Sequence, residues 1–193
     1  MHPPPALKPA LDALAQAMDA RFDRLLTVPD DPRRRLYEAM RHATMDGGKR
    51  MRPLLTVAAC DLFGVDKERS LRVALAIECV HCYSLVHDDL PCMDDDDMRR
   101  GKPTVHKAFD EATAVLAGDA LLTLAFEILA DEATHEDPNI RVQLIQELAK
   151  AAGPAGMVGG QAMDLAAETT TFDLPTTTRL QQLKTGALLA VCI

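Results

Sequence analysis

A group of six aspartates constrains this chain more than any other feature, because it follows directly on an apolar helical stretch. The aspartates are Asp88, Asp89, Asp94, Asp95, Asp96 and Asp97, and the arginines Arg99 and Arg100 come soon after them. Carboxylates about 5 Å apart repel each other by ~3 kcal/mol per pair at an effective dielectric constant near 20. A bound cation would offset this repulsion, and oxygen ligands favour a hard ion such as Mg²⁺ over zinc. Because forked guanidinium groups match phosphate oxygens, we also expect a phosphorylated substrate.

Two alternative interpretations of the acidic run are a solvated surface loop and an EF-hand calcium site. An isolated acidic run is usually a solvated loop, but this one ends an apolar helical stretch and is followed by arginines. An EF-hand that starts within residues 94–96 would need a glutamate at its twelfth position. The residues at that position are Val105, His106 and Lys107. The sequence therefore favours a magnesium site that binds a phosphorylated ligand.

Composition narrows the fold class and the kind of ligand. The 193 residues are 48% hydrophobic and only 4% aromatic. Such a chain, rich in Ala and Leu, favours packed helices over sheets. Its length suits one domain or part of a larger one. The net charge of −8 argues against a nucleic-acid surface, so a phosphorylated ligand would have to rely on local basic clusters and metal.

The sequence also indicates where the protein is found. No stretch approaches 18 uninterrupted apolar residues, and the first residues lack a basic region followed by an apolar one. We therefore expect a cytoplasmic protein without stable membrane insertion. Five cysteines in mostly apolar surroundings fit buried thiols in a reducing compartment. Cys79 and Cys82 flank His81, but we expect no zinc there because no second Cys/His pair lies at zinc spacing.

Apolar residues recur at helical spacing along most of the chain. The expected helices span residues 9–26, 32–45, 53–62, 67–90, 106–133 and 139–152, and a last one starts at residue 176. Prolines and glycines between these segments end one helix or begin the next. A succession of helices and short loops predicts an all-α bundle of mostly antiparallel helices, formed by a single domain.

The segment DGGKRMRPLL, residues 46–55, gathers basic side chains at a turn. Gly47 and Gly48 would end the preceding helix, so that Lys49, Arg50 and Arg52 are presented together. Clustered cations beside a glycine turn suit a phosphate, although the order of residues is not that of a P-loop. From the residues alone, a solvated basic turn is the alternative.

The expected central helix places candidate ligands on one face. Ile77, His81, Ser84 and Asp88 follow one another at spacings of four, three and four, which puts them on one face of the helix. His81 therefore points the same way as Asp88 and lies about two turns from it. A single histidine on a helix is more often a core residue, so the shared face is what makes His81 a candidate ligand.

Two later segments combine polar residues with an apolar helical pattern. In GGQAMD, Gln161 and Asp164 lie three residues apart and share a helix face. In LKTGALL, Lys184 and Thr185 interrupt an apolar face, where a buried lysine needs a partner. Because a single helical carboxylate is commonly a surface residue, these two segments alone do not define a site.

The motifs together resemble those of the trans-type short-chain prenyl diphosphate synthases. DDLPCMD followed by DDDMRRGKPT is similar to the first aspartate-rich motif of that family, in the bacterial form with two extra residues between the aspartates. GGKRMRP, AGDALLTLAFEIL, GGQAMD and KTG also match the family, and the closest similarity is to bacterial farnesyl diphosphate synthases. The resemblance implies an all-α, antiparallel helix bundle of the isoprenoid synthase type around a deep central cavity.

The resemblance also implies a reaction, namely head-to-tail condensation of isopentenyl diphosphate with dimethylallyl or geranyl diphosphate, assisted by Mg²⁺, to give farnesyl diphosphate. The implied metal ligands are Asp88 and Asp94, with Asp89 supporting. The implied isopentenyl diphosphate ligands are Lys49, Arg52, His81 and Arg100. The implied allylic ligands are Arg99, Gln161, Asp164, Lys184 and Thr185, and Tyr83 and Ser84 would lie where the hydrocarbon tail ends. Asp88, Asp94, Arg99 and Lys184 would be the catalytic residues, and the family usually forms homodimers.

One departure from the family pattern concerns its second aspartate-rich motif, which supplies the remaining metal ligands. This motif is absent from the 193 residues, so we expect the amino-terminal part of a longer protein, without the family's carboxy-terminal helices. A longer-chain synthase would share all the motifs described above. A class I terpene cyclase would share the metal site but would not need a second diphosphate site. A non-catalytic helical subunit is the third alternative.

Overall fold

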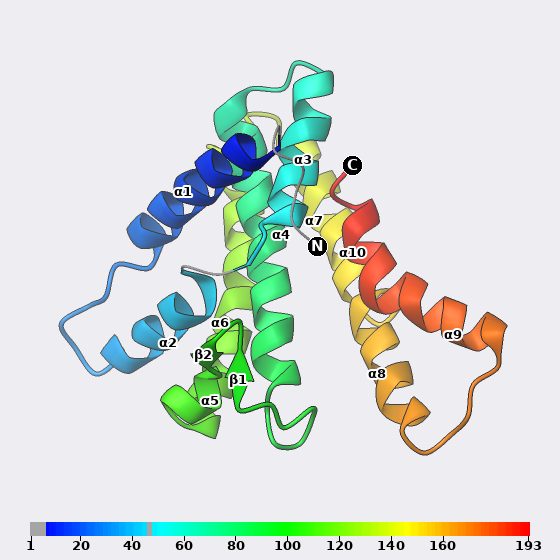
Figure 1. Cartoon of the computed structure of the whole chain (residues 1–193). Helices are drawn as coiled ribbons and strands as arrows, with labels where there is room; N and C mark the ends of the chain where they lie inside the picture. Colours follow the sequence, from blue (N-terminus) through cyan, green and yellow to red (C-terminus); the bar gives the residue numbers. More distant parts are fainter. Residues whose placement is uncertain (1–6, 46–47) are drawn as a thin grey trace.

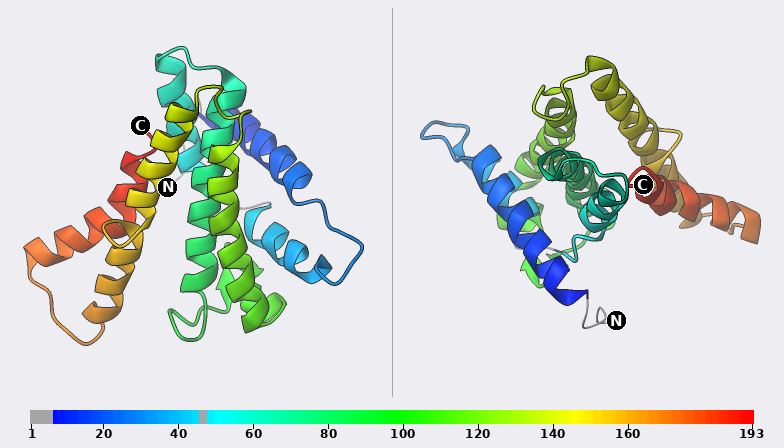
Figure 2. Two further views of the ribbon diagram at one scale, coloured as in Figure 1. Left: turned by 180° about the vertical axis from the view of Figure 1, so that it is seen from behind. Right: turned by 90° about the horizontal axis from the view of Figure 1, so that it is seen from above.

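The structure, a computed structural model, describes residues 7–45 and 48–193 and forms a bundle of antiparallel helices. Its centre is the pair α4 (Lys67–Asp88) and α6 (Glu111–Ala130). Figures 1 and 2 show this pair with α1 (Lys8–Leu25) and α2 (Arg34–Thr44) on one side. On the other side lie α7 (Pro138–Ala152), α8 (Met157–Ala167), α9 (Leu174–Gln181), the π-helical turn η1 (Gln182–Gly186) and α10 (Ala187–Ala190). The prediction of an all-α bundle is confirmed, whereas the predicted turn at Gly47 lies outside the described residues.

Four of the described helices have an aspartate as their N-cap residue. Asp66, Asp110, Asp137 and Asp173 each accept a hydrogen bond from a backbone N–H two or three residues further on. These caps satisfy N–H groups that have no partner inside the helix. The predicted helix over residues 106–133 was wrong at its start. Because Asp110 caps a new helix, this segment forms the short α5 (Val105–Ala108) and then α6.

Two other helices begin two residues away from the prolines that were predicted to start them. α2 begins at Arg34 rather than at Pro32, and α3 (Met51–Leu62) begins before Pro53. Proline is tolerated in a first helical turn because its missing N–H would have had no partner there. The predicted boundaries of the remaining helices agree closely with the structure.

The core lies around α4, which is buried on several sides. Large buried side chains come from α1, α4, α6 and α7, and they include Met18, Phe22, Leu71, Leu75, Ile77, Val80, Leu121, Leu129 and Leu148. Burial of one such side chain contributes about 1.5–3 kcal/mol. The alanines Ala74, Ala76, Ala114, Ala117 and Ala125 are fully buried on α4 and α6, and their small size fits the close packing of these two helices. The core therefore fixes α4, which carries four of the predicted site residues, His81, Tyr83, Ser84 and Asp88.

Helix α6 is long and apolar enough to cross a membrane by length and composition, with a mean hydropathy of 1.7. In the bundle it packs along α4, and Leu121, Ala125 and Leu129 on its inner side are buried in the core. A core helix of this kind has its partner within the protein.

A two-stranded hairpin, which was not predicted, follows the acidic run. β1 (Met98–Arg99) pairs with β2 (Lys102–Pro103) in antiparallel register. Arg100 and Gly101 form the turn with φ angles of 54° and 80°, and positive φ at both positions is typical of the tightest hairpin turns. The hairpin separates the two neighbouring arginines, because Arg99 lies in a strand and Arg100 in the turn.

The predicted helix from residue 176 onward is not a regular α-helix. It begins at Leu174, and residues Gln182–Gly186 form a π turn, in which hydrogen bonds span five residues instead of four. Such turns are rare and frequently occur at functional sites. This one carries Lys184 and Thr185, two of the predicted allylic ligands.

Candidate functional site

A cavity of about 590 Å³, here called the apolar cavity, brings together residues of α3, α4, α6, α8 and η1. Its polar lining residues are Arg52, His81, Tyr83, Ser84, His87, Asp88, Gln161, Lys184 and Thr185. Its apolar lining residues include Leu85, Leu90, Met93, Val115, Met157, Val158 and Leu165. Charged groups beside a large apolar wall suit a ligand with an anionic head and a hydrocarbon tail.

The predicted face of α4 points into the apolar cavity. His81, Ser84 and Asp88 all line it, as their spacing indicated, whereas Ile77 is buried further along the helix. Tyr83 also lines the cavity and is only 6% exposed, with its ring packed edge-on against His87 at 5.8 Å between centroids. The aromatic ring of Tyr83 is therefore held in place against its neighbour.

A second cavity, of about 500 Å³, adjoins the first and is here called the basic cavity. It is lined by Gly48, Lys49, Arg50, Met51, Arg52, Glu78, His81 and Arg100. Arg52 and His81 line both cavities, so the two are adjacent. The basic cavity collects all four residues predicted to bind the second diphosphate. Its Arg52 has a buried Nε with no hydrogen-bond partner among the described residues, so this guanidinium is available to a ligand.

The prediction that Lys49, Arg50 and Arg52 are presented together is wrong for Arg50. Lys49 is exposed and Arg52 is half-buried, but Arg50 is 3% exposed. Its guanidinium is paired with Glu78 at 2.8 Å and with Asp19 at 2.7 Å. The backbone of Arg50 is left-handed at this point, and the side chain lies inside the protein.

His81 is uncharged at neutral pH. Burial lowers its pKa to about 3, and the positive charges of Arg52 and Arg100 act in the same direction. The Nη2 of Arg100 lies 3.4 Å from Nε2 of His81. Because a guanidinium only donates hydrogen bonds, Nε2 is the acceptor and the proton of the neutral ring is on Nδ1. His81 therefore offers a ligand one N–H donor without adding charge.

Asp88 is the aspartate that faces the apolar cavity. Burial raises its pKa to about 6, and the negative charges of Asp94 and Asp89 act in the same direction against Lys184 and Arg99. The backbone N–H of Asp94 donates to the carbonyl oxygen of Asp88 at 2.8 Å, which holds the start of the acidic loop against the helix end. Neither Asp88 nor Asp94 forms an ion pair within residues 7–45 and 48–193.

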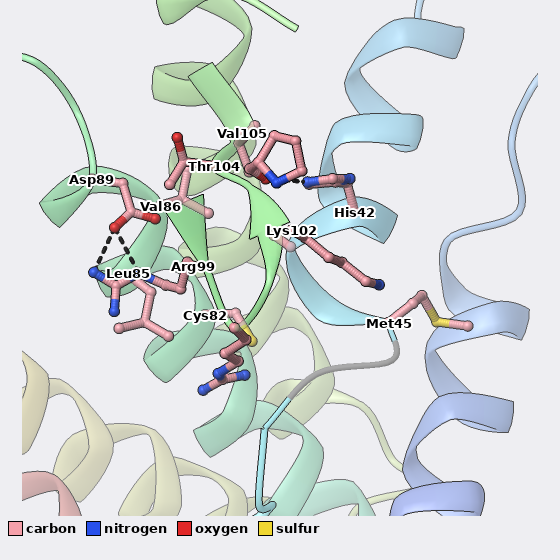
Figure 3. A pocket seen from close by; sticks show the side chains of 13 residues that line it. His42, Met45, Cys82, Leu85, Val86, Asp89, Arg99, Lys102, Thr104 and Val105 are labelled. Carbon is pink, nitrogen blue, oxygen red and sulfur yellow. Dashed lines mark hydrogen bonds and ion pairs between the residues drawn. The ribbon is translucent and has the colours of Figure 1, made fainter. Parts of the chain in front are cut away.

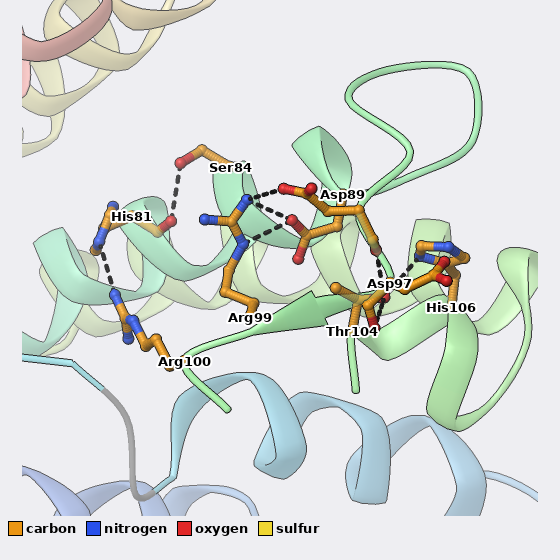
Figure 4. A network of polar contacts seen from close by, with 9 residues as sticks. His81, Ser84, Asp89, Asp97, Arg99, Arg100, Thr104 and His106 are labelled. Carbon is orange, nitrogen blue, oxygen red and sulfur yellow. Dashed lines mark hydrogen bonds and ion pairs between the residues drawn. The ribbon is translucent and has the colours of Figure 1, made fainter. Parts of the chain in front are cut away.

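Asp89 faces away from the apolar cavity and is paired with Arg99. The Nε and Nη2 atoms of Arg99 lie 2.6 Å and 2.5 Å from Oδ1 of Asp89, and Nη2 also reaches Asp96 at 3.1 Å (Figure 4). Burial raises the pKa of Asp89, and the hydrogen bond from Arg99 opposes this shift. Two predicted ligands, one for metal and one for diphosphate, therefore bind each other.

The hairpin holds Arg99 in this position. Asp89 and Arg99 line a small cavity of about 50 Å³ between α2, α4 and the hairpin, shown in Figure 3. On its other side, Nε2 of His42 in α2 donates to the carbonyl oxygen of Pro103 at 2.7 Å, which ties β2 to α2. Figure 4 shows Arg100 lying instead beside His81, so the two arginines have different partners.

Lys184 and Asp164, predicted on separate helices, form an ion pair. The Nζ of Lys184 lies 2.5 Å from Oδ2 of Asp164, which satisfies the expectation that the lysine needs a partner. Gln161, one helical turn before Asp164, lines the apolar cavity with a buried Nε2 that has no partner in the part of the chain that the structure describes. Helix α8 therefore supplies one anchor for Lys184 and one free amide.

Gly160 sets the distance between α8 and the π turn, and replacing it by alanine is expected to disturb the site. A Cβ at this position would overlap with the backbone nitrogen of Lys184, which cannot move without the whole turn. We expect Gly160→Ala to lower the free energy of unfolding by about 1–3 kcal/mol, as overpacking typically does. Urea unfolding of the full-length protein measures this. Gly186→Ala is the matched control, since a Cβ there meets its nearest atom at 3.7 Å, and equal losses in the two variants would contradict the packing argument.

The donor set of the acidic run fits Mg²⁺. Asp88 and Asp94 offer carboxylate oxygens that no basic residue in the described ranges occupies, and burial raises the pKa of Asp88 although Lys184 and Arg99 act in the opposite direction. Asp95, Asp97 and His106 form a separate group whose ligand atoms lie within 4.8 Å of one another. Asp97 in this group is paired with Lys107 at 2.8 Å, and Nδ1 of His106 lies 3.2 Å from the hydroxyl of Thr104. The buried Nε2 of His106 has no hydrogen-bond partner among the described residues.

Several residues of the site were not predicted. Glu78 lines the basic cavity, and the signal for it was a single carboxylate inside the apolar run ALAIECV of α4. His87 packs between Tyr83 and α6, where its Nε2 donates to the carbonyl oxygen of Val115 at 3.1 Å. The position of His87 next to Asp88 in the sequence could have identified it as a residue of the site. Nothing in the residue pattern indicated the π turn.

Comparison with known proteins gives consistent results. A family model described as polyprenyl synthetase matches residues 33–193. Farnesyl diphosphate synthase of Geobacillus stearothermophilus is 46% identical over 180 residues, which cover 93% of this chain and 60% of the relative. The large subunit 1 of a heterodimeric chloroplastic geranylgeranyl pyrophosphate synthase of Arabidopsis thaliana is 53% identical over 137 residues, covering 69% of this chain and 37% of the relative.

A solved structure extends the similarity to the fold. The apo crystal structure of an FPP/GFPP synthase from Zymomonas mobilis superimposes with a TM-score of 0.95 at 66% sequence identity. The match covers 97% of this chain and 68% of that structure. The chain thus spans about 60% of the length of the curated bacterial relatives that it matches.

Proposed function

Since the chain belongs to the polyprenyl synthetase family, we propose that the full-length protein is a prenyltransferase that condenses isopentenyl diphosphate with an allylic diphosphate. The observation that carries this proposal is the pair of adjacent cavities. One has the carboxylate of Asp88 and an apolar wall, the other is basic, and the two meet at Arg52 and His81. This arrangement supports a reaction between two diphosphate substrates of which one carries a long hydrocarbon.

The apolar cavity suits the allylic substrate, dimethylallyl or geranyl diphosphate. Lys184 would contact its diphosphate, with Gln161 and Thr185 in the same cavity lining. Arg99 and Asp164 would act from outside this lining, where they pair with Asp89 and Lys184. Asp88 and Asp94, with Asp89 supporting, would hold Mg²⁺, which when bound neutralises the diphosphate and makes it a better leaving group. The tail would run along the apolar wall toward Ser84 and Tyr83.

The basic cavity suits isopentenyl diphosphate. Lys49, Arg52 and Arg100 would bind its diphosphate, and the Nδ1–H of neutral His81 would donate a further hydrogen bond. Breaking of the allylic carbon–oxygen bond gives an allylic cation and free diphosphate. The double bond of isopentenyl diphosphate then attacks this cation, and a proton is lost to the departing diphosphate. The chain needs no nucleophilic side chain for this sequence, because the substrate's own double bond is the nucleophile.

The product that we propose is farnesyl diphosphate. Tyr83 supports this length, because its buried ring stands in the wall of the apolar cavity five residues before the first aspartate. A longer product is the second candidate, favoured by the similarity to a geranylgeranyl pyrophosphate synthase subunit. We further propose that the protein acts as a cytoplasmic homodimer, and that residues 1–193 are part of one prenyl diphosphate synthase domain.

One assay separates this proposal from the alternatives. The full-length protein is incubated with labelled isopentenyl diphosphate, geranyl diphosphate and Mg²⁺, and the products are separated by chromatography. Labelled farnesyl diphosphate is expected. Cyclic hydrocarbons without incorporation of label would indicate a terpene cyclase, and the absence of any product would indicate a non-catalytic subunit.

Substitution of the two cationic sites should affect different substrates. Arg52→Ala is expected to raise the KM for isopentenyl diphosphate, and Arg99→Ala the KM for the allylic substrate. Because charge-assisted contacts contribute about 1.5–3 kcal/mol each, we expect increases of roughly 10- to 150-fold. Arg34→Ala, which removes an exposed arginine of α2, is the control and should leave both constants unchanged. The two-site assignment is wrong if both variants raise the KM of the same substrate alone.

A further inference from the structure

Arg50 differs from the basic residues around it because its side chain turns into the protein. It is 3% exposed, and its backbone has φ 48° and ψ 37° where α3 begins. A residue with a Cβ adopts this left-handed conformation only where surrounding contacts hold it. The contacts of the guanidinium must therefore explain why the chain keeps this conformation next to the basic cavity.

The guanidinium of Arg50 is bound by three helices. Nη1 donates to Oε1 of Glu78 in α4 at 2.8 Å, and Nη2 donates to Oδ1 of Asp19 in α1 at 2.7 Å and to the carbonyl oxygen of Thr44 in α2 at 2.5 Å. The ring of Phe22 lies 5.7 Å from the guanidinium carbon. Burial alone would lower the pKa of Arg50, but the two carboxylates outweigh it and raise the pKa. Arg50 is therefore a permanently charged partner for Glu78.

Glu78 presents a problem for an anion-binding cavity. Among the described residues that line the basic cavity it is the only acidic one, and it is 2% exposed, three residues before His81 on α4. A buried carboxylate without a partner would repel a diphosphate strongly, because the surroundings screen it poorly. In the structure its charge is balanced by Arg50, so that Lys49, Arg52 and Arg100 determine the charge that a ligand meets.

We propose that Arg50 is a positioning residue for isopentenyl diphosphate, which it affects through Glu78 by cancelling the negative charge in the wall of the basic cavity. This inference rests on the proposed function of that cavity. Arg50 does not touch the ligand. It allows the carboxylate of Glu78 to anchor the beginning of α3 to α4 without weakening the binding of an anion beside it.

The test compares variants that keep, remove or rebalance the charge in the full-length protein. Arg50→Gln removes the positive charge that is paired with Glu78. It is expected to raise the KM for isopentenyl diphosphate at least tenfold and to change the KM for geranyl diphosphate less than threefold. Arg50→Lys keeps the charge and should stay within threefold of the wild type. The double variant Arg50→Gln/Glu78→Gln restores the net charge that Arg50, Glu78 and Asp19 have together in the wild type, and it should return the constant to within threefold of the wild-type value.

A purely structural role predicts a different pattern. All three variants lose the forked contacts of Arg50, so equal increases in KM in all of them, or equal increases for both substrates, would overturn the proposal. Arg72→Gln is the matched control, because it removes a partly buried arginine of α4 that pairs with Asp131 at 2.8 Å, away from the cavity. It should lower the unfolding temperature without changing either KM.

A binding measurement keeps the inference separate from the reaction. Titration calorimetry with inorganic diphosphate, without Mg²⁺, reports on the basic cavity whether or not the protein transfers a prenyl group, and Arg50→Gln should weaken binding at least tenfold. If the wild type binds diphosphate but makes no product, the proposed function fails while the role of Arg50 is still decided by these affinities. If Arg50→Gln does not fold, Glu78→Gln replaces it. This variant should bind diphosphate about threefold more tightly, and weaker binding would overturn the proposal.

Discussion

Replacement of Asp88 by alanine in the full-length protein is expected to reduce turnover at least ~10²-fold. Asp88 is the one aspartate of the run that lines the apolar cavity, and its carboxylate has no basic partner in the described part of the chain. Removing one preorganised electrostatic contact costs on the order of 2.7 kcal/mol in the transition state. Steady-state kinetics with isopentenyl and geranyl diphosphate measure this loss, and EDTA should abolish the same activity.

Two further variants show whether the charge of Asp88 is responsible. Asp88→Asn keeps the shape of the side chain but not its charge, so it should be almost as inactive as the alanine variant. Asp23→Ala removes an exposed carboxylate that pairs with Arg41 on the far side of the bundle and should retain full turnover. Near-normal activity of the Asp88 variants, or activity in chelator, would rule out ionisation of the substrate at this metal site.

Replacement of Tyr83 by alanine is expected to change the product from fifteen carbons to twenty or more. The ring of Tyr83 is buried in the wall of the apolar cavity and is supported edge-on by His87, so it presents a firm stop to a growing hydrocarbon. Its removal leaves space for at least one further isoprene unit. Chromatography of the labelled products distinguishes the chain lengths directly.

The second tyrosine of the chain provides the control for this change. Tyr37 lies on α2 and lines neither cavity, so Tyr37→Ala should leave the product unchanged. An unchanged fifteen-carbon product from Tyr83→Ala would mean that another residue forms the stop. A shift in both variants would point to a general loosening of the bundle rather than to an opened cavity.

Local patterns were sufficient to predict the parts of the site that lie on one helix. The spacing of His81, Ser84 and Asp88 depends only on helix geometry, so their common cavity followed from the sequence. The helix starts capped by aspartate likewise depend on a few neighbouring residues. The break before α6 interrupts a continuous helical pattern, because Asp110 caps a new helix there.

Features that depend on distant partners could not be predicted from such patterns. Nothing in the local sequence distinguishes Arg50 from Lys49. Only the left-handed backbone and the carboxylates of Asp19 and Glu78 show that the side chain of Arg50 is buried. The pairing of Arg99 with Asp89 depends in the same way on the hairpin, whose turn brings β1 back to the end of α4. Both cases require contacts across the fold.

The π turn at Gln182–Gly186 changes the angular phase of the last helix. Eight residues of regular α-helix rotate by about 80° beyond two full turns, so Leu180 and Leu188 would point in clearly different directions. The wider turn between them reduces the rotation per residue and absorbs much of this excess, and both leucines are buried as the helix runs along α7 and α8. The π turn holds about one residue more than a regular helical turn. It thus allows a single helix to bury its leucines on one side and to project Lys184 toward the cavity.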